Sequence, residues 1–136
     1  MANALYAKAK QGLLDGSIDM DSDDIKAILV DGDDYTPNMA TDDNLDDIPG
    51  GAIVATSDNL SNKSVTDGVF DADDVVFSAV TGDKFEYVIL YKDSGTPGTS
   101  RLILLIDSAT GLPCTPTGGD ITIVWDNGTS KIFRLA

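Results

Sequence analysis

Apolar residues in this chain come in short runs separated by aspartate, asparagine and glycine, and this spacing constrains the fold more than any other feature. Runs of five to seven residues bounded by turn-forming residues are typical of β-strands, whereas helices need longer periodic segments. The runs span residues 25–30, 52–56, 64–70, 75–80, 85–91, 102–106, 121–125 and 131–135. About eight short strands favour a mainly β fold, an antiparallel β-sandwich with a jelly-roll-like arrangement.

The N-terminal segment departs from this pattern and predicts a short helix over residues 4–14. The segment is rich in helix formers, and Asn3 and Gly16 stand where a cap and a stop are expected. Its apolar residues recur at helical spacing, at Leu5, Ala9 and Leu13. Such a helix packs either on its own domain or on a neighbouring molecule, and both alternatives stay open.

The length of 136 residues predicts one domain, since it supports one core and is short for two. We expect residues 1–16 to form a helical segment or arm, and residues 17–136 to form the β-sandwich. On this view residues 1–14 can be removed without loss of the fold.

Three further features refine the predicted strands. The runs 85–91 and 102–106 are almost continuously apolar, which is typical of strands covered on both faces. Asp126-Asn127-Gly128 lies between the last two runs and predicts a hairpin. The segment 31–51 is the least strand-like, and we expect Leu45 and Ile48 to anchor one helical turn within it.

Negative charge is concentrated in the first half of the chain. Residues 1–74 hold seventeen Asp and four Lys, a net charge of −13, whereas residues 75–136 hold five Asp, one Glu and five Lys or Arg, a net charge of −1. Such a density of negative charge repels nucleic acid and anionic membrane surfaces, so we expect neither as a partner. We also expect no membrane span and no secretory signal, because no apolar stretch is long enough.

The chain offers few groups for catalysis. It has no histidine, which removes the usual general base and the Ser-His and Cys-His nucleophile arrangements. Its one cysteine, Cys114, lies between prolines with no basic neighbour to activate it. Paired carboxylates could serve glycoside hydrolysis, but among 22 Asp such pairs are unavoidable and mean little. We therefore expect a protein that is not an enzyme.

Calcium binding is the better use for the carboxylates. Asp19, Asp21 and Asp23 occupy positions 1, 3 and 5 of an EF-hand-like loop. The pattern fails at position 6, which is Asp24 instead of Gly, and at position 12, which is Val30 instead of Glu. We expect no cofactor, and the alternative is a calcium site of another kind formed by Asp19, Asp21, Asp31 and Asp33.

The aromatic residues raise the question of a carbohydrate-binding platform. Trp125, Tyr87 and Tyr91 all lie within predicted strands, where aromatic residues usually belong to the core. Tyr35 lies beside Pro37 in the segment between strands, so we expect it to be the exposed candidate.

Read end to end, the chain resembles a family of small virion proteins of tailed bacteriophages. The motifs that carry the resemblance are Asn3-Ala4-Leu5-Tyr6, Asp24-Ile25-Lys26, Leu29-Val30-Asp31, Tyr35-Thr36-Pro37, Lys63-Ser64-Val65-Thr66-Asp67-Gly68, Phe70-Asp71-Ala72-Asp73-Asp74-Val75, Tyr91-Lys92-Asp93-Ser94-Gly95 and Trp125-Asp126-Asn127-Gly128. They cover nearly the whole chain and describe turns and strands, so they indicate a family more firmly than a function.

The resemblance implies a capsid decoration (cement) protein, in which a β domain binds the outer surface of the capsid and stabilises it. The expected partner is the major capsid protein, the expected assembly a homotrimer, and the expected location the capsid exterior after assembly in the host cytoplasm. The residues expected at the capsid or subunit interface are Ala4, Leu5, Tyr6, Leu13, Thr96, Pro97, Thr99 and Arg101. The alternative is a tail, neck or fibre adaptor or receptor-binding module.

Overall fold

Three apolar strands form the centre of the molecule. The computed structural model describes residues 3–109, 111–125 and 131–134. Its largest sheet has five strands in the order β1 (Ala4–Leu5), β8 (Leu102–Ile106), β7 (Tyr87–Lys92), β2 (Ile25–Val30) and β3 (Ile53–Thr56). Every neighbouring pair is antiparallel.

The central strands β2, β7 and β8 are buried on both faces, as the continuous apolar runs predict for β7 and β8. Ile28 of β2 lies opposite Ile89 of β7, and Leu90 of β7 lies opposite Leu104 of β8. All four side chains are buried in the core. Because alternate residues of these strands point to opposite faces, both faces must be covered by other parts of the chain.

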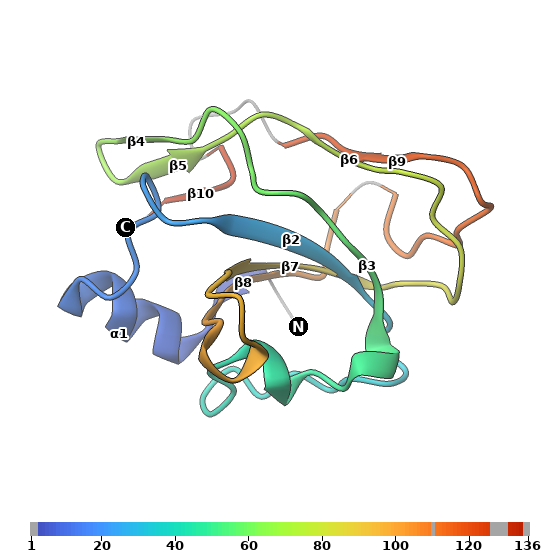
Figure 1. Cartoon of the computed structure of the whole chain (residues 1–136), viewed down its shortest axis with the longest axis horizontal. Helices are drawn as coiled ribbons and strands as arrows, with labels where there is room; N and C mark the ends of the chain where they lie inside the picture. Colours follow the sequence, from blue (N-terminus) through green and yellow to red (C-terminus); the bar gives the residue numbers. More distant parts are fainter. Residues whose placement is uncertain (1–2, 110, 126–130, 135–136) are drawn as a thin grey trace.

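Two small sheets cover one face of the large sheet (Figure 1). One has three strands in the order β10 (Phe133–Arg134), β5 (Val69–Asp71) and β4 (Ser64–Thr66). The other pairs β6 (Val75–Phe77) with β9 (Ile121–Ile123). Phe70 of β5 packs near Phe133 of β10 with ring centroids 5.6 Å apart. The large sheet and this pair of small sheets make the sandwich.

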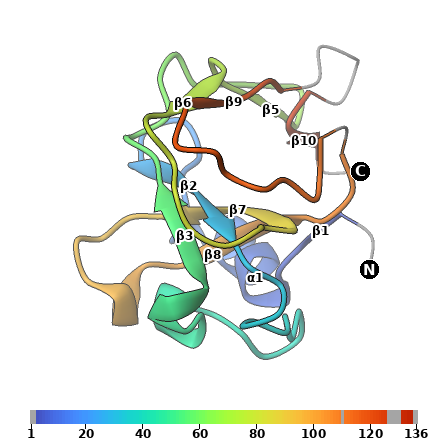
Figure 2. The same ribbon diagram turned by 90° about the vertical axis from the view of Figure 1, so that its right-hand side faces the viewer.

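Helical elements cover the opposite face (Figure 2). They are α1 (Ala7–Asp15) and three short 3₁₀ turns, η1 (Leu45–Asp47), η2 (Gly50–Ala52) and η3 (Pro97–Thr99). The turn η1 confirms the helical turn expected in the segment 31–51, with Ile48 buried directly after it. The mainly β, antiparallel sandwich with one N-terminal helix is therefore confirmed. Within the described residues the strands number ten, in sheets of five, three and two, where about eight were expected.

Several predicted strands differ from the observed ones. The run 64–70 is a hairpin and not one strand, because Asp67 and Gly68 both have positive φ, 52° and 79°, and reverse the chain between β4 and β5. Two adjacent left-handed residues are what a type I′ hairpin turn requires. The predicted hairpin at Asp126-Asn127-Gly128 lies outside the described residues. The strands on either side of it pair elsewhere, β9 with β6 and β10 with β5.

The N-terminal segment is part of the sheet. The helix begins at Ala7 and not at residue 4, because Ala4 and Leu5 pair with β8 as strand β1. Asn3 does not cap the helix, and its Oδ1 accepts hydrogen bonds from the backbone N–H groups of Asp107 and Ser108. Gly16 ends the helix with φ 83°, as predicted. Because β1 pairs with β8 and Tyr6 and Ala9 are buried, the structure argues against the expectation that residues 1–14 are dispensable for the fold.

A buried chain of hydrogen bonds joins this segment to the long connection between β2 and β3. The Tyr6 hydroxyl lies 3.0 Å from the Tyr35 hydroxyl, which donates to Asp42 Oδ2 at 2.7 Å. The Ala7 N–H donates to the Met39 carbonyl at 2.9 Å. Burial raises the pKa of both phenols above their ordinary value, so each keeps its proton. These bonds order a connection whose sequence predicts little structure.

We expect the Tyr6→Ala variant to lose about 3–5 kcal/mol of unfolding free energy, the usual cost of truncating a buried aromatic side chain. Tyr6 has no exposed surface and also contacts Tyr35, so both the core and the connection would suffer. Urea unfolding followed by circular dichroism measures the loss. The control is Gln11→Ala at an exposed position of α1, with an expected change within about 0.5 kcal/mol. Equal stability of the two variants would contradict the assignment of Tyr6 to the core.

Candidate functional site

The loop between β7 and β8 is the most clearly constructed exposed feature of the molecule. Its tip, Ser94–Thr99, is exposed and contains the turn η3. The loop is held by its own hydrogen bonds, since Ser94 Oγ lies 2.6 Å from Thr99 Oγ1 and Ser100 Oγ donates to the Thr96 carbonyl at 2.9 Å. Ser100 is itself buried beneath the tip. The side-chain hydroxyls thus fix the loop from within.

The base of the loop is anchored to β2. Asp93 Oδ2 lies 2.9 Å from the Lys26 ammonium, and Asp93 Oδ1 accepts the Gly95 N–H at 2.9 Å. The Asp93 N–H donates to the Asp24 carbonyl at 2.8 Å. The Gly95 N–H and then the Lys26 ammonium hold the pKa of Asp93 below its ordinary value. The hydrogen bond to the Asp93 carboxylate in turn raises the pKa of Lys26. The loop therefore leaves the sheet in a defined direction.

The tip lies beside the acidic turn η1. The Leu45 N–H donates to the Ser100 carbonyl at 2.8 Å, and the Leu102 N–H donates to the Asp43 carbonyl at 3.0 Å. The Asp43 N–H in turn binds Asp47 Oδ2 at 2.8 Å, which holds the pKa of Asp47 below its ordinary value. An uncharged loop and an acidic turn thus share one corner of the molecule.

The predicted interface residues fall into two groups. Thr96, Pro97 and Thr99 are exposed on the tip, and Arg101 is half-buried below it. The Arg101 guanidinium donates to the Lys8 carbonyl at 3.2 Å, so it ties the base of the loop to α1. The second group lies in the N-terminal segment, where Ala4, Leu5 and Leu13 are half-buried and Tyr6 is fully buried. The side chain of Tyr6 serves the core and is not available to a partner.

The aromatic residues do not form an exposed platform. We expect Tyr35 on the surface, but it is only 4% exposed. Its hydroxyl is held between the Tyr6 hydroxyl and the Asp42 carboxylate. Trp125 and Tyr91 are buried, as expected, although Trp125 lies after the end of β9 and not within it. Trp125 Nε1 donates to the Asp73 carbonyl at 2.9 Å. Sugar binding by stacking on Tyr35 or Trp125 is therefore not favoured by the geometry.

The calcium site of Asp19, Asp21, Asp31 and Asp33 is not formed. The first two precede β2 and the last two follow it, and a strand of six residues separates its ends by about 20 Å. Asp19 Oδ1 instead accepts the backbone N–H groups of Asp21 and Ser22 at 3.1 and 3.3 Å. A hydrogen bond from the Ser22 side chain, and then those two backbone bonds, hold the pKa of Asp19 below its ordinary value.

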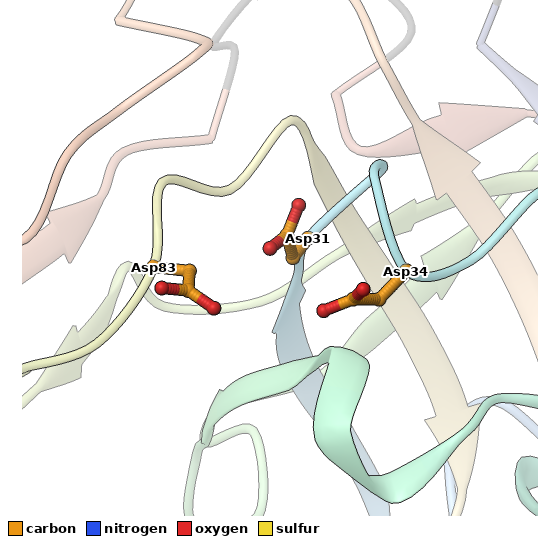
Figure 3. A group of neighbouring side chains, drawn as sticks. All are labelled: Asp31, Asp34 and Asp83. Carbon is orange, nitrogen blue, oxygen red and sulfur yellow. The ribbon is translucent and has the colours of Figure 1, made fainter.

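A different acidic cluster is present at the far end of β2. Asp31 is buried at the end of the strand, and oxygens of Asp34 and Asp83 come within 4.8 Å of it and of one another (Figure 3). Sequence reasoning missed Asp83 because the loop before β7 brings it from fifty residues away. Carboxylate oxygens suit calcium, but calcium takes six to eight oxygens and these three side chains supply only part of that number.

Comparison with known proteins does not extend this description. No protein-family model matches the chain, and no curated protein matches it. No helix among the described residues is long and apolar enough to cross a membrane.

We expect acidification to weaken the anchoring of the β7–β8 loop through Asp93. The contribution of a carboxylate with a lowered pKa is complete above its ordinary pKa of about 3.9 and is lost as the pH falls through its lower folded value. The Asp93→Asn variant lacks this contribution at every pH. The difference in urea midpoint between wild type and variant should therefore close between about pH 5 and pH 2. Asp67→Asn removes the same charge in the β4–β5 turn, and an identical pH profile for the two variants would contradict the anchoring role.

We expect the Asp83→Asn variant to gain stability in a chelator at low salt, because it relieves repulsion from Asp31 and Asp34. The gain should be below about 1 kcal/mol, as is usual for exposed charges, and should shrink at physiological ionic strength. Thermal unfolding at two salt concentrations measures it. A loss of stability at low salt would contradict the view that the three carboxylates repel one another, and would show that the Asp83 carboxylate stabilises the fold.

Proposed function

We propose that this chain is a structural protein of a tailed-bacteriophage virion that binds the outer surface of the capsid and stabilises it as a decoration protein. One observation carries the proposal. The exposed tip Ser94–Thr99 bears no charge on a chain of net charge −14, and its own hydrogen bonds hold its shape. A loop ordered before docking loses little entropy when it binds, so a small contact can suffice.

The proposed partner is the major capsid protein, whose many copies present the same contact repeatedly. Each contact of Thr96, Pro97 and Thr99 is small, but an assembly that engages several copies at once gains avidity. We propose a homotrimer for this reason, because closed cyclic assembly places three loops against a lattice at one time. Bridging neighbouring capsid subunits in this way stabilises the shell.

The acidic surface fits this position. A protein on the outside of a DNA-filled head meets free nucleic acid and membrane debris during assembly in the host cytoplasm. A net charge of −14 repels both classes of polyanion. The carboxylates then need no chemical role, since repulsion and solubility are sufficient reasons for them.

A place in the tail, neck or fibre is the alternative. A receptor-binding module that stacks sugars needs exposed aromatic rings, and the burial of Tyr35 and Trp125 removes the candidates for them. The decoration role is therefore the function that the geometry supports better.

The test is to count this chain in purified virions that carry either the wild type or the Thr96→Asp variant. Quantitative mass spectrometry against the major capsid protein should give the wild type a ratio near one or a simple fraction of it. An unpaired charge buried in the contact should lower occupancy by about tenfold or more. Thr81→Asp, in an exposed loop after β6, is the matched control and should keep full occupancy.

Each other outcome has a meaning. A few copies per particle would replace the decoration role with the tail or neck. Absence of the chain from the virion would overturn both structural roles. Full occupancy of the Thr96→Asp variant would remove the β7–β8 loop from the contact.

A further inference from the structure

An apolar hollow lies between the C-terminal end of α1 and the three-stranded sheet. Its volume is about 460 Å³. Figure 1 shows α1 at the lower left of the molecule and the three-stranded sheet above it, at the upper left. The apolar side chains that line it are Leu13, Ile18, Met20, Val65, Phe70 and Phe133. Asp19 and Asp21 also line it, and both are exposed, so they lie at its edge. The hollow thus combines an apolar floor with an acidic rim.

The outer face of α1 carries the complementary groups. Leu14 is 86% exposed, the highest exposure among the large apolar side chains that the structure describes. Lys10 precedes it by one helical turn on the same exposed face, since residues four apart are neighbours on a helix. Within the described part of the chain Lys10 makes no ion pair, whereas Lys26 and Lys92 are paired with Asp93 and Asp23.

We infer that the occupant of the hollow is α1 of a second copy of this chain. Leu14 of one copy enters the apolar floor of the next, and Lys10 meets the acidic rim formed by Asp19 and Asp21. Charge complementarity selects this occupant, because a cation and an apolar side chain one turn apart face an acidic edge and an apolar floor. The inference takes the trimer from the proposed function and adds the contact that joins its subunits.

The arrangement also favours closure of a ring. Leu13 lines the hollow and Leu14 projects beside it, so the projecting group and the receiving surface lie at the same corner of one subunit. A contact from projection to hollow is heterologous, and it closes into a ring when the rotation between copies permits. With both surfaces at one corner, the contacts lie close to the ring axis.

Sedimentation velocity of the purified chain tests the inference. The wild type should self-associate as a trimer, and the Leu14→Asp variant should sediment as a monomer. Val76→Asp places the same charge at a different exposed apolar residue, on β6, and should associate like the wild type. Circular dichroism shows that each variant keeps its fold, which is expected because the replaced side chains are exposed.

A charge exchange makes the test specific. Lys10→Asp and Asp21→Lys should each weaken association by about tenfold, and the double variant, which has the wild-type net charge, should recover it. A monomeric wild type, an unaffected Leu14→Asp variant or a double variant without recovery would overturn the inference. If the chain is a monomer in solution but still fills the capsid lattice, the inference is overturned and the decoration role stands. If the chain forms a trimer that depends on Leu14 but is absent from virions, the inferred subunit contact stands and the decoration role is overturned.

Discussion

The burial of β2, β7 and β8 on both faces determines the rest of the structure. These strands carry almost only apolar side chains, and the backbone groups between them are satisfied by the antiparallel ladder. Two layers of cover are then needed, and a chain of 136 residues has only short elements left to build them. The small sheets on one face and α1 with the 3₁₀ turns on the other are these layers. Charge is displaced into the loops that connect them.

This displacement explains how so acidic a chain remains ordered. Several aspartates accept backbone N–H groups within turns, namely Asp19, Asp42, Asp47 and Asp93. Their carboxylate oxygens take the place of the water molecules that would otherwise bind these N–H groups in a loop. The same backbone bonds are the largest cause of the lowered pKa of Asp47 and Asp93, whereas for Asp19 a hydrogen bond from the Ser22 side chain comes first and the backbone bonds second. Aspartate suits this role better than glutamate because its shorter side chain reaches its own neighbouring backbone. The seventeen Asp of the first half therefore include structural residues of the loops.

The sequence predicts the elements that local patterns determine and misses those that depend on distant contacts. The run 102–106 coincides with β8, because apolar continuity alone defines it. The turn at Asp67-Gly68 was within reach of sequence reasoning, since the dipeptide is a known hairpin signal, but the apolar residues around it suggested one strand. The burial of Tyr35 could not be predicted, because its partner Tyr6 belongs to the N-terminal segment. The approach of Asp83 to Asp31 had no sequence signal for the same reason.

The β7–β8 loop and α1, each of which takes part in one proposed contact, belong to one layer of the fold. Figures 1 and 2 place α1, η1 and η3 on the same face of the large sheet. The hydrogen bond from Arg101 to the Lys8 carbonyl connects the base of the β7–β8 loop directly to α1. Fixing α1 against a second copy therefore also fixes the position of the loop. In a ring closed near α1, the loops of all copies would lie at similar distances from the axis, which is the geometry that simultaneous contact with a regular lattice requires.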